Sequence, residues 1–440
     1  MSKRLILVLA LAFVVGIAFA AYAEVQNVKV GGDLLIRGVA RNNLDLKNSG
    51  TAGDKESDQA SFFMSTVRVK VDADLTDNVG VVVRLLNERL WNVDDDYADN
   101  NQIEVDLAYA TLKEFLYSPL TVIVGRQPLR VGHALIIGDP DTNRTTTGYA
   151  TGVHLPAIAR DLSARKSFDA IRANLNYDPL VIDLVYAKGY EGDVTRNDDV
   201  DVYGVIAKYN LDKKTAIEPY LVVKSSGVNA SGAVVGKTDK IYDLGTTIYA
   251  APIENLTTSL EGSWQLGYNN TTLNKRKAWA LQAMADYLFA KQKYTPGLGI
   301  GYTYLSGDKN TADKRNSVWD PMFEDQTLNS IPNLLFVNSN MQVINVKGSI
   351  KPKDDLTLSA NYGYYRLAQK VSSLAGYATW TTMSDKKSLG SALDLAATYD
   401  YTEDVQLGLD FGWFAPGAAF DTAAGNRDAT QLIGSMKVTF

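Results

Sequence analysis

The sequence predicts an all-β protein: a transmembrane, antiparallel, up-and-down β-barrel that follows a cleaved signal peptide. Three features support this fold class. The chain opens with a short apolar run behind basic residues, its remainder alternates repeatedly between apolar and polar residues, and its alternating segments are joined by short turns and long polar loops in turn.

Residues 1–23 form the export segment. Lys3 and Arg4 give a positive start, residues 5–20 are an uninterrupted apolar run, and Ala21-Tyr22-Ala23 places small residues where a signal peptidase cuts. A membrane anchor is the alternative, but the run is short for a span of about 20 residues. We therefore expect the mature chain to begin at Glu24.

The repeating unit of residues 24–440 is a strand with two different faces. Val67, Val69 and Val71 alternate with Arg68 and Lys70, and similar runs recur to the end of the chain. Alternate side chains of a strand face opposite sides of a sheet. We therefore expect an apolar face toward lipid and a charged face toward a lumen.

The connections predict the barrel topology. Tight turns are expected at 77–78, 178–179, 212–213 and 403–404, and long loops at 42–59, 92–102, 191–200, 225–240 and 306–339. Outer-membrane barrels combine short periplasmic turns with longer extracellular loops. The pattern gives about 18 strands, with 16 as the alternative count, and makes 306–339 a long extracellular loop. Residues 122–137 are the hardest to divide between strand and loop.

The last segment resembles the final strand of such a barrel. Leu432, Met436 and Val438 share one face, and the chain ends on Phe440. An aromatic end of this kind is an assembly signal, so the expected partners include the barrel-assembly machinery and outer-membrane lipids. The predicted location is the bacterial outer membrane.

The charged face supplies the candidate pore lining. Arginine is concentrated in the early strands, and its planar guanidinium binds carboxylate and phosphate in a bidentate manner. That favours anionic solutes, while the alternative is that opposite charges pair across strands and only hydrate the wall. The candidates on the wall are Arg37, Arg41, Arg68, Lys70, Arg84, Arg172, Glu88, Glu104 and Asp106.

Residues 131–166 form the second candidate site. They contain both histidines, His133 and His154, together with Arg144, Arg160 and Arg165. Loops of this length are often functional. Two arrangements stay open, a constriction loop folded into the lumen and an ordinary extracellular loop.

Arg126, just before this stretch, is harder to orient. If Val122 and Val124 face lipid, Arg126 falls on the same face, unless a bulge at Gly125 turns the strand.

Several function classes are disfavoured. A net charge of -6 argues against a nucleic-acid binder, and the chain has no cysteine. Neither histidine lies in a recognisable Ser-His arrangement, so no enzyme and no cofactor are expected. Asp139-x-Asp141-x-Asn143 resembles the start of a calcium loop, but Arg144 stands where the turn needs glycine, so no metal is expected.

Three stretches resemble the alginate-export family of outer-membrane porins. They are Val124-Gly125-Arg126-Gln127, the strand 301–308 ending in Ser306-Gly307-Asp308, and the loop around 319–323. The resemblance implies a monomeric barrel with an arginine-rich lumen for an anionic polysaccharide, and places Arg126 in the pore. This sequence differs in having as many lumen acids as bases.

The favoured function is a passive channel for hydrophilic solutes, with an anionic saccharide as the finer expectation. A structural or adhesive barrel and a barrel enzyme are the alternatives.

The export segment gives the first test. N-terminal sequencing of the mature protein should read from Glu24, because the segment before it carries the cleavage signal. The protein should fractionate with outer membranes and give β-type circular dichroism. Recovery from the soluble periplasm, or a helical spectrum, would contradict the predicted fold.

Overall fold

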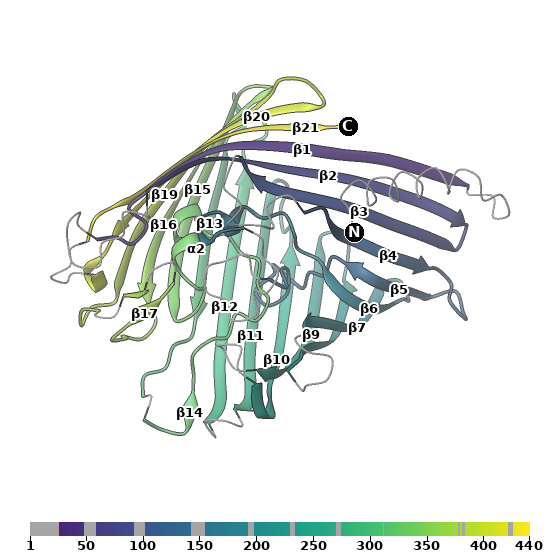
Figure 1. Cartoon of the computed structure of the whole chain (residues 1–440), viewed down its shortest axis with the longest axis horizontal. Coiled ribbons are helices and arrows are strands. Elements are labelled where there is room, and N and C mark those ends of the chain that lie inside the picture. The colour runs from purple at the N-terminus through teal and green to yellow at the C-terminus, as the bar shows by residue number, and fades with distance from the viewer. Residues whose placement is uncertain are drawn as a thin grey trace.

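A computed structural model describes residues 26–47, 59–91, 102–141, 155–191, 198–228, 234–269, 274–310, 312–376, 379–380, 383–420 and 426–440. Within these residues, eighteen long strands form one closed antiparallel barrel (Figure 1). The predicted fold class and strand number are confirmed. The predicted export segment, 1–23, lies outside the described residues.

The wall is built in chain order. Its strands are β1 (Asn27–Asn42), β2 (Ala60–Thr76), β3 (Val79–Leu90), β4 (Glu104–Leu112), β5 (Leu120–Gln127), β6 (Phe168–Asn176), β7 (Leu180–Tyr190), β8 (Val200–Asn210), β9 (Thr215–Val228), β10 (Val234–Ala250), β11 (Leu256–Asn269), β12 (Asn274–Leu288), β13 (Gly297–Leu305), β15 (Met341–Lys353), β16 (Leu356–Leu367), β19 (Ser388–Asp400), β20 (Val405–Pro416) and β21 (Ala429–Thr439).

The remaining elements are short. β14 (Arg315–Asn316) runs parallel to the start of β12, and β17 (Leu374–Ala375) pairs with β18 (Thr379–Trp380). The helices are η3 (Ala157–Leu162), α2 (Ser330–Leu335) and η4 (Ala418–Phe420). In the described part of the chain, no helix is long and apolar enough to cross a membrane.

Closure depends on the pairing of β1 with β21, from Asp33 opposite Thr439 to Asn42 opposite Thr430. Gly32 and Phe440 extend this seam, since each backbone N–H donates to the other's carbonyl oxygen, at 2.8 and 3.0 Å. A Cβ at Gly32 would lie 2.8 Å from Phe440 Cζ, so the close approach requires glycine. Every wall strand therefore has two neighbours.

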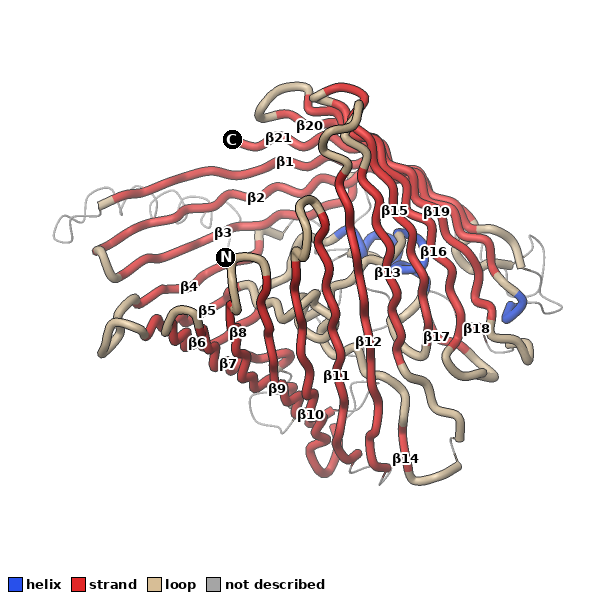
Figure 2. The backbone as a smooth tube through the Cα atoms, turned by 180° about the vertical axis from the view of Figure 1, so that it is seen from behind, coloured by secondary structure: helices blue, strands red, loops and turns tan. Residues whose placement is uncertain are grey.

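The two ends of the barrel differ as predicted. The tight turns at 77–78, 178–179, 211–214 and 401–404 lie at one end, and the longer connections lie at the other (Figure 2). The expected loop at 225–240 is wrong, because β9 continues to Val228 and β10 begins at Val234. Serines and charged residues in this hairpin gave it the composition of a loop.

The two faces of the wall follow the period-two pattern. Leu395 and Leu409 are exposed on the outer face, at 43% and 52%. Their neighbours Asp394 and Asp410 point to the enclosed side. Apolar side chains thus cover the outside, and the charged side chains line the lumen.

Two of the long connections fold back into the barrel. They are the 128–167 connection between β5 and β6, described at 128–141 and 155–167, and the 306–340 connection between β13 and β15, described at 306–310 and 312–340 (Figure 1). Ile136, Ile137, Phe323, Leu334 and Leu335 from these two connections are buried in one hydrophobic cluster together with wall residues. The interior of the barrel therefore has a core of its own.

The orientation of the faces gives a test on β19. Leu395→Arg should place a charge in the lipid-facing band, which costs about 2–4 kcal/mol near the midplane of a barrel. Ala396→Arg, the matched control, should cost much less, because Ala396 pairs with Asp410 on the lumen side. Urea unfolding in lipid vesicles measures both. Equal destabilisation, or a larger effect of Ala396→Arg, would contradict this assignment of the two faces.

Candidate functional site

The 128–167 connection is anchored to the wall near the seam. The guanidinium of Arg41 on β1 donates to both carboxylate oxygens of Asp161 in η3, at 2.9 and 2.6 Å. Both side chains are buried, at 0% and 8% exposure. Arg37, four residues earlier on the same face of β1, donates from Nη1 to the carbonyl oxygen of Leu162 at 2.8 Å. Two of the predicted wall arginines therefore hold the loop.

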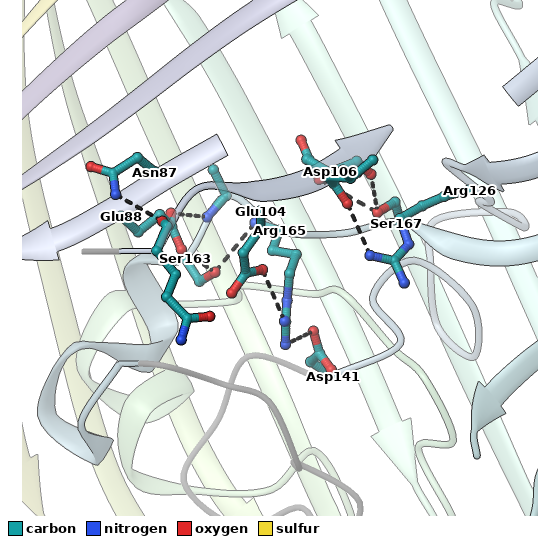
Figure 3. A network of polar contacts seen from close by, with 12 residues as sticks. Asn87, Glu88, Glu104, Asp106, Arg126, Asp141, Ser163, Arg165 and Ser167 are labelled. Carbon is teal, nitrogen blue, oxygen red and sulfur yellow. Dashed lines mark hydrogen bonds and ion pairs between the residues drawn. The ribbon is translucent and has the colours of Figure 1, made fainter. Parts of the chain in front are cut away.

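Wall acids complete this anchor (Figure 3). Glu88 on β3 accepts hydrogen bonds from Ser163 Oγ and from the backbone N–H of Ala164, both at 2.7 Å. Arg165 lies between Glu104 of β4, at 3.2 Å, and Asp141 of the same connection, at 2.6 Å. The positive charge of this loop arginine is thus met by two acids.

The beginning of the same connection reaches the opposite wall. The backbone N–H of Gly132 donates to Glu218 on β9 at 2.8 Å, and that of His133 donates to Glu261 on β11 at 3.0 Å. Gly132 has a φ of +54°, and a Cβ there would lie 2.6 Å from Thr247 Oγ1. Only glycine fits this approach. The connection therefore spans the lumen.

The 306–340 connection is anchored on the same side and further round the wall. Lys224 on β9 binds Asp320 at 3.2 Å, and Gln265 on β11 accepts from the backbone N–H of Asp320 at 2.9 Å. Asn329 and Ser330, at the start of α2, both donate to Asp394 on β19, at 2.8 and 3.1 Å. The loop that was expected to be extracellular therefore begins at that end and folds into the lumen.

The two connections also pack on each other. Ile137 forms a parallel bridge with Phe323, and the N–H of Phe323 donates to the carbonyl oxygen of Ile136 at 2.9 Å. The carboxylate of Asp325 forms ion pairs with Arg130, at 3.1 Å, and with Lys166. Hydrophobic contact and ion pairs thus join the two inward loops.

The lumen remains open on the side of the short turns. A cavity of about 570 Å³ lies there against β11 to β19, lined by Thr257, Asp286, Lys347, Ser349, Asn361 and Asp394 among others. These side chains are polar and come from the inner face of the wall. Asp394 also holds the start of α2, so the inward 306–340 connection borders this cavity.

Three arginine–aspartate pairs lie on the inner wall. Arg68 holds Asp33, and Arg172 holds Asp183, each through Nε and Nη2, and Arg84 holds Asp106 through Nε. The arginine side chains are 25%, 31% and 24% exposed. Lys70 is paired more loosely with Asp72, at 2.9 Å. The predicted wall residues face the lumen, and their charges are largely paired.

Arg126 lies on the face that alternation with Val124 indicates, and not on the pore face that the family resemblance implies. It pairs with Asp169 and follows Val124, which is opposite the exposed Ile171, with no register shift at Gly125. Gly125 has a φ of +120° but does not turn the strand. Arg126 therefore points outward at the loop end of the barrel, where its guanidinium holds Asp169 at 2.9 and 2.7 Å.

The loop basics are only partly placed. Arg160 and Arg165 lie in the inward connection, and Arg160 Nε donates to the carbonyl oxygen of Leu155 at 3.1 Å. Arg144 and His154 lie outside the described residues. The sequence left open whether 131–166 folds into the lumen; its described parts contact the inner face of the wall.

Sequence reasoning missed the acids that anchor the loops. Asp161 and Asp320 each pair with a cation of the wall, yet neither belongs to an alternating segment. Asp320 precedes Pro321, a pair that is typical of a turn, and this was the one local signal. Nothing in the spacing of Asp161 indicates that it meets Arg41.

Comparisons with known proteins agree with this geometry. The Alginate export family matches residues 27–433. No curated protein matches. Among solved structures, Pseudomonas aeruginosa OccK11 (OpdR) is 12% identical, with a TM-score of 0.57 over 94% of this chain and 96% of that chain. The P. aeruginosa outer membrane protein OpdK is 11% identical, with a TM-score of 0.57 over 94% and 100%. Acinetobacter baumannii OccAB2 is 9% identical, with a TM-score of 0.56 over 95% and 99%.

The Asp320 anchor gives a pH test. Burial raises the pKa of Asp320, but the charges of Lys224 and Arg276 and hydrogen bonds outweigh it and lower the pKa to about 2. This is below the unfolded value of about 3.9. The stabilisation is therefore complete above pH 4 and is lost as the pH falls toward 2.

Asp320→Asn should loosen the anchor at neutral pH, because it leaves Lys224 without its carboxylate. The neighbouring Trp319 is 1% exposed, so its fluorescence should shift to the red and become open to acrylamide. The parent should show that change only in acid. Asp313→Asn, on an exposed part of the same connection, is the control. An unchanged spectrum for Asp320→Asn would contradict the anchor.

Proposed function

The chain belongs to the alginate export family, and from this premise we propose that it is a passive outer-membrane channel that favours anionic hydrophilic solutes, with carboxylated oligosaccharides as the class. The channel and its place in the bacterial outer membrane follow from the family and the closed barrel. The choice of solute is the proposed part. The observation that carries it is the set of paired arginines on the inner wall.

Each pair presents an arginine in a fixed position. In Arg68 and Arg172 the aspartate takes up Nε and Nη2, and no partner is found for Nη1 within the described residues. Arginine has five N–H donors in a planar fork. A carboxylate of a passing solute can therefore bind the remaining donors while the aspartate holds the side chain in place.

Partial neutralisation of the wall arginines by aspartate suits the passage of an anionic solute. A channel must attract its solute enough for entry but release it again. An isolated arginine would bind a carboxylate strongly, whereas an arginine already paired with Asp33 or Asp183 retains less positive field. A series of such weak sites along the wall lets a polyanion advance from one to the next.

In this proposal the arginines of the wall, and not those of the inward loop, bind the solute. The charge of Arg165 is met by Glu104 and Asp141, so it contributes little field to the lumen. The inward connections instead narrow the passage and force the solute against the wall. The family's name supports the same cargo, since alginate is a polymer of carboxylated sugars.

The paired design can be tested without changing the net charge. Replacing Asp33→Asn with Arg68→Gln, and Asp183→Asn with Arg172→Gln, removes two sites and leaves the lumen's total charge as it was. Block of single-channel current by oligouronates should weaken at least about tenfold, since each lost charged hydrogen bond contributes about 1.5–3 kcal/mol. The reversal potential in a salt gradient should change little.

The matched control is the outward pair, Arg126→Gln with Asp169→Asn, which should leave the block unchanged. Neutral oligosaccharides of equal length should block parent and variant alike. Undiminished oligouronate block in the variant that lacks both pairs would rule out the wall pairs as the solute track.

A further inference from the structure

A row of cations crosses the outer face at the loop end of β10, β11, β12 and β14. Lys240 is opposite Tyr268, Tyr268 is opposite Lys275, and Lys275 is opposite Arg315. Lys277, two residues further along β12, lies on the same face opposite Leu266. These four strands run side by side in Figure 2. The four cations, Lys240, Lys275, Lys277 and Arg315, are all exposed and are called the outer basic patch below.

An apolar and aromatic band lies directly beneath this patch. Leu244, Trp264 and Trp279 form the next outward row, at 55%, 60% and 40% exposure. Trp279 stacks on Tyr304 with ring centroids 4.3 Å apart. Tryptophan and tyrosine gather where hydrocarbon meets headgroups. This row therefore marks the outer boundary of the membrane.

Strand geometry sets the height of the cations above that boundary. A barrel strand rises about 3.3 Å per residue and is tilted by about 40°, so each residue adds about 2.5 Å along the barrel axis. Tyr287, at the other end of β12, lies about 20 Å from Trp279 along the barrel axis, a separation similar to the height of about 25 Å of the apolar band of a barrel. Lys277 lies about 5 Å above Trp279, and Lys275 about 10 Å. That interval is where lipid headgroups lie.

Among the described residues, the cations of the patch have no acidic partner, unlike two other basic residues at the same end of the barrel. Arg126 is neutralised by Asp169, and Lys188 is held by Glu191, Asp199 and Asp201. Among the described residues, no ion pair joins any member of the outer basic patch to an acid. Asp313 is close to Arg315, but its carboxylate accepts from the backbone N–H.

We propose that the outer basic patch binds the phosphate groups of a phosphorylated glycolipid in the outer leaflet, whose acyl chains lie against the aromatic row below. A phosphorylated glycolipid matches the patch in charge and in height, because the cations lie at headgroup level above an outer face that contacts hydrocarbon. A soluble anion would not need that face. The inference holds for any solute that the lumen carries.

The test compares glycolipid binding by purified full-length mature protein. The variant carries Lys240→Ser, Lys275→Ser, Lys277→Ser and Arg315→Ser. The control carries four serines at lysines of the short turns, Lys213, Lys214, Lys291 and Lys293, and so has the same net charge. Native mass spectrometry counts bound lipopolysaccharide, and heat-modified mobility on gels verifies that each barrel is folded.

Affinity of the variant should fall at least about tenfold, since each basic side chain near an anionic surface adds to the attraction, while the control should match the parent. With the parent alone, enzymatic removal of the lipid phosphates, or 1 M salt, should release the lipid. Equal binding by variant and parent, or parent binding that ignores phosphate and salt, would overturn the proposal. The parent measurements decide the matter even if the variant does not fold.

Discussion

A chain inside hydrocarbon has no water with which to hydrogen-bond, so each backbone N–H and carbonyl must find a partner within the protein. In this protein the seam between β1 and β21 meets that requirement, and without it two strands would present unpaired edges to lipid. Closure of the ring also determines which environment each side chain meets. Once the strands form a ring, the period of two assigns every other side chain to lipid, and the residues between must line an enclosed space.

That space is filled from within by the two inward connections. Lipid determines the composition of the outer face, whereas the inner face is matched to loops that come from distant strands. Wall acids such as Glu88, Glu218 and Glu261 accept hydrogen bonds from loop backbone, and wall arginines such as Arg41 are paired with loop acids. The same charged residues therefore hold the lumen's shape and determine its field.

Alternation along the chain was enough to predict the strands, their faces and their approximate number, because it reflects a local rule. Alternation was not enough where the role of a residue depends on distant parts of the chain. The polar hairpin around Ser225 and Lys240 reads as a loop because strands that rise beyond the membrane no longer need an apolar face. For Arg126 the alternation with Val124 indicated the outward face, and it was the family resemblance that placed this residue in the pore. The anchor between Arg41 and Asp161 joins positions 120 residues apart, which no spacing pattern records.

The bridge between Ile137 and Phe323 also affects how the passage can change its width. Apolar residues of both connections are buried in the same cluster, so neither can withdraw alone without exposing apolar side chains to water. The two act as one plug with anchors around the circumference. Widening of the passage is then a single concerted transition, and its energetic cost is shared among anchors that lie on opposite walls.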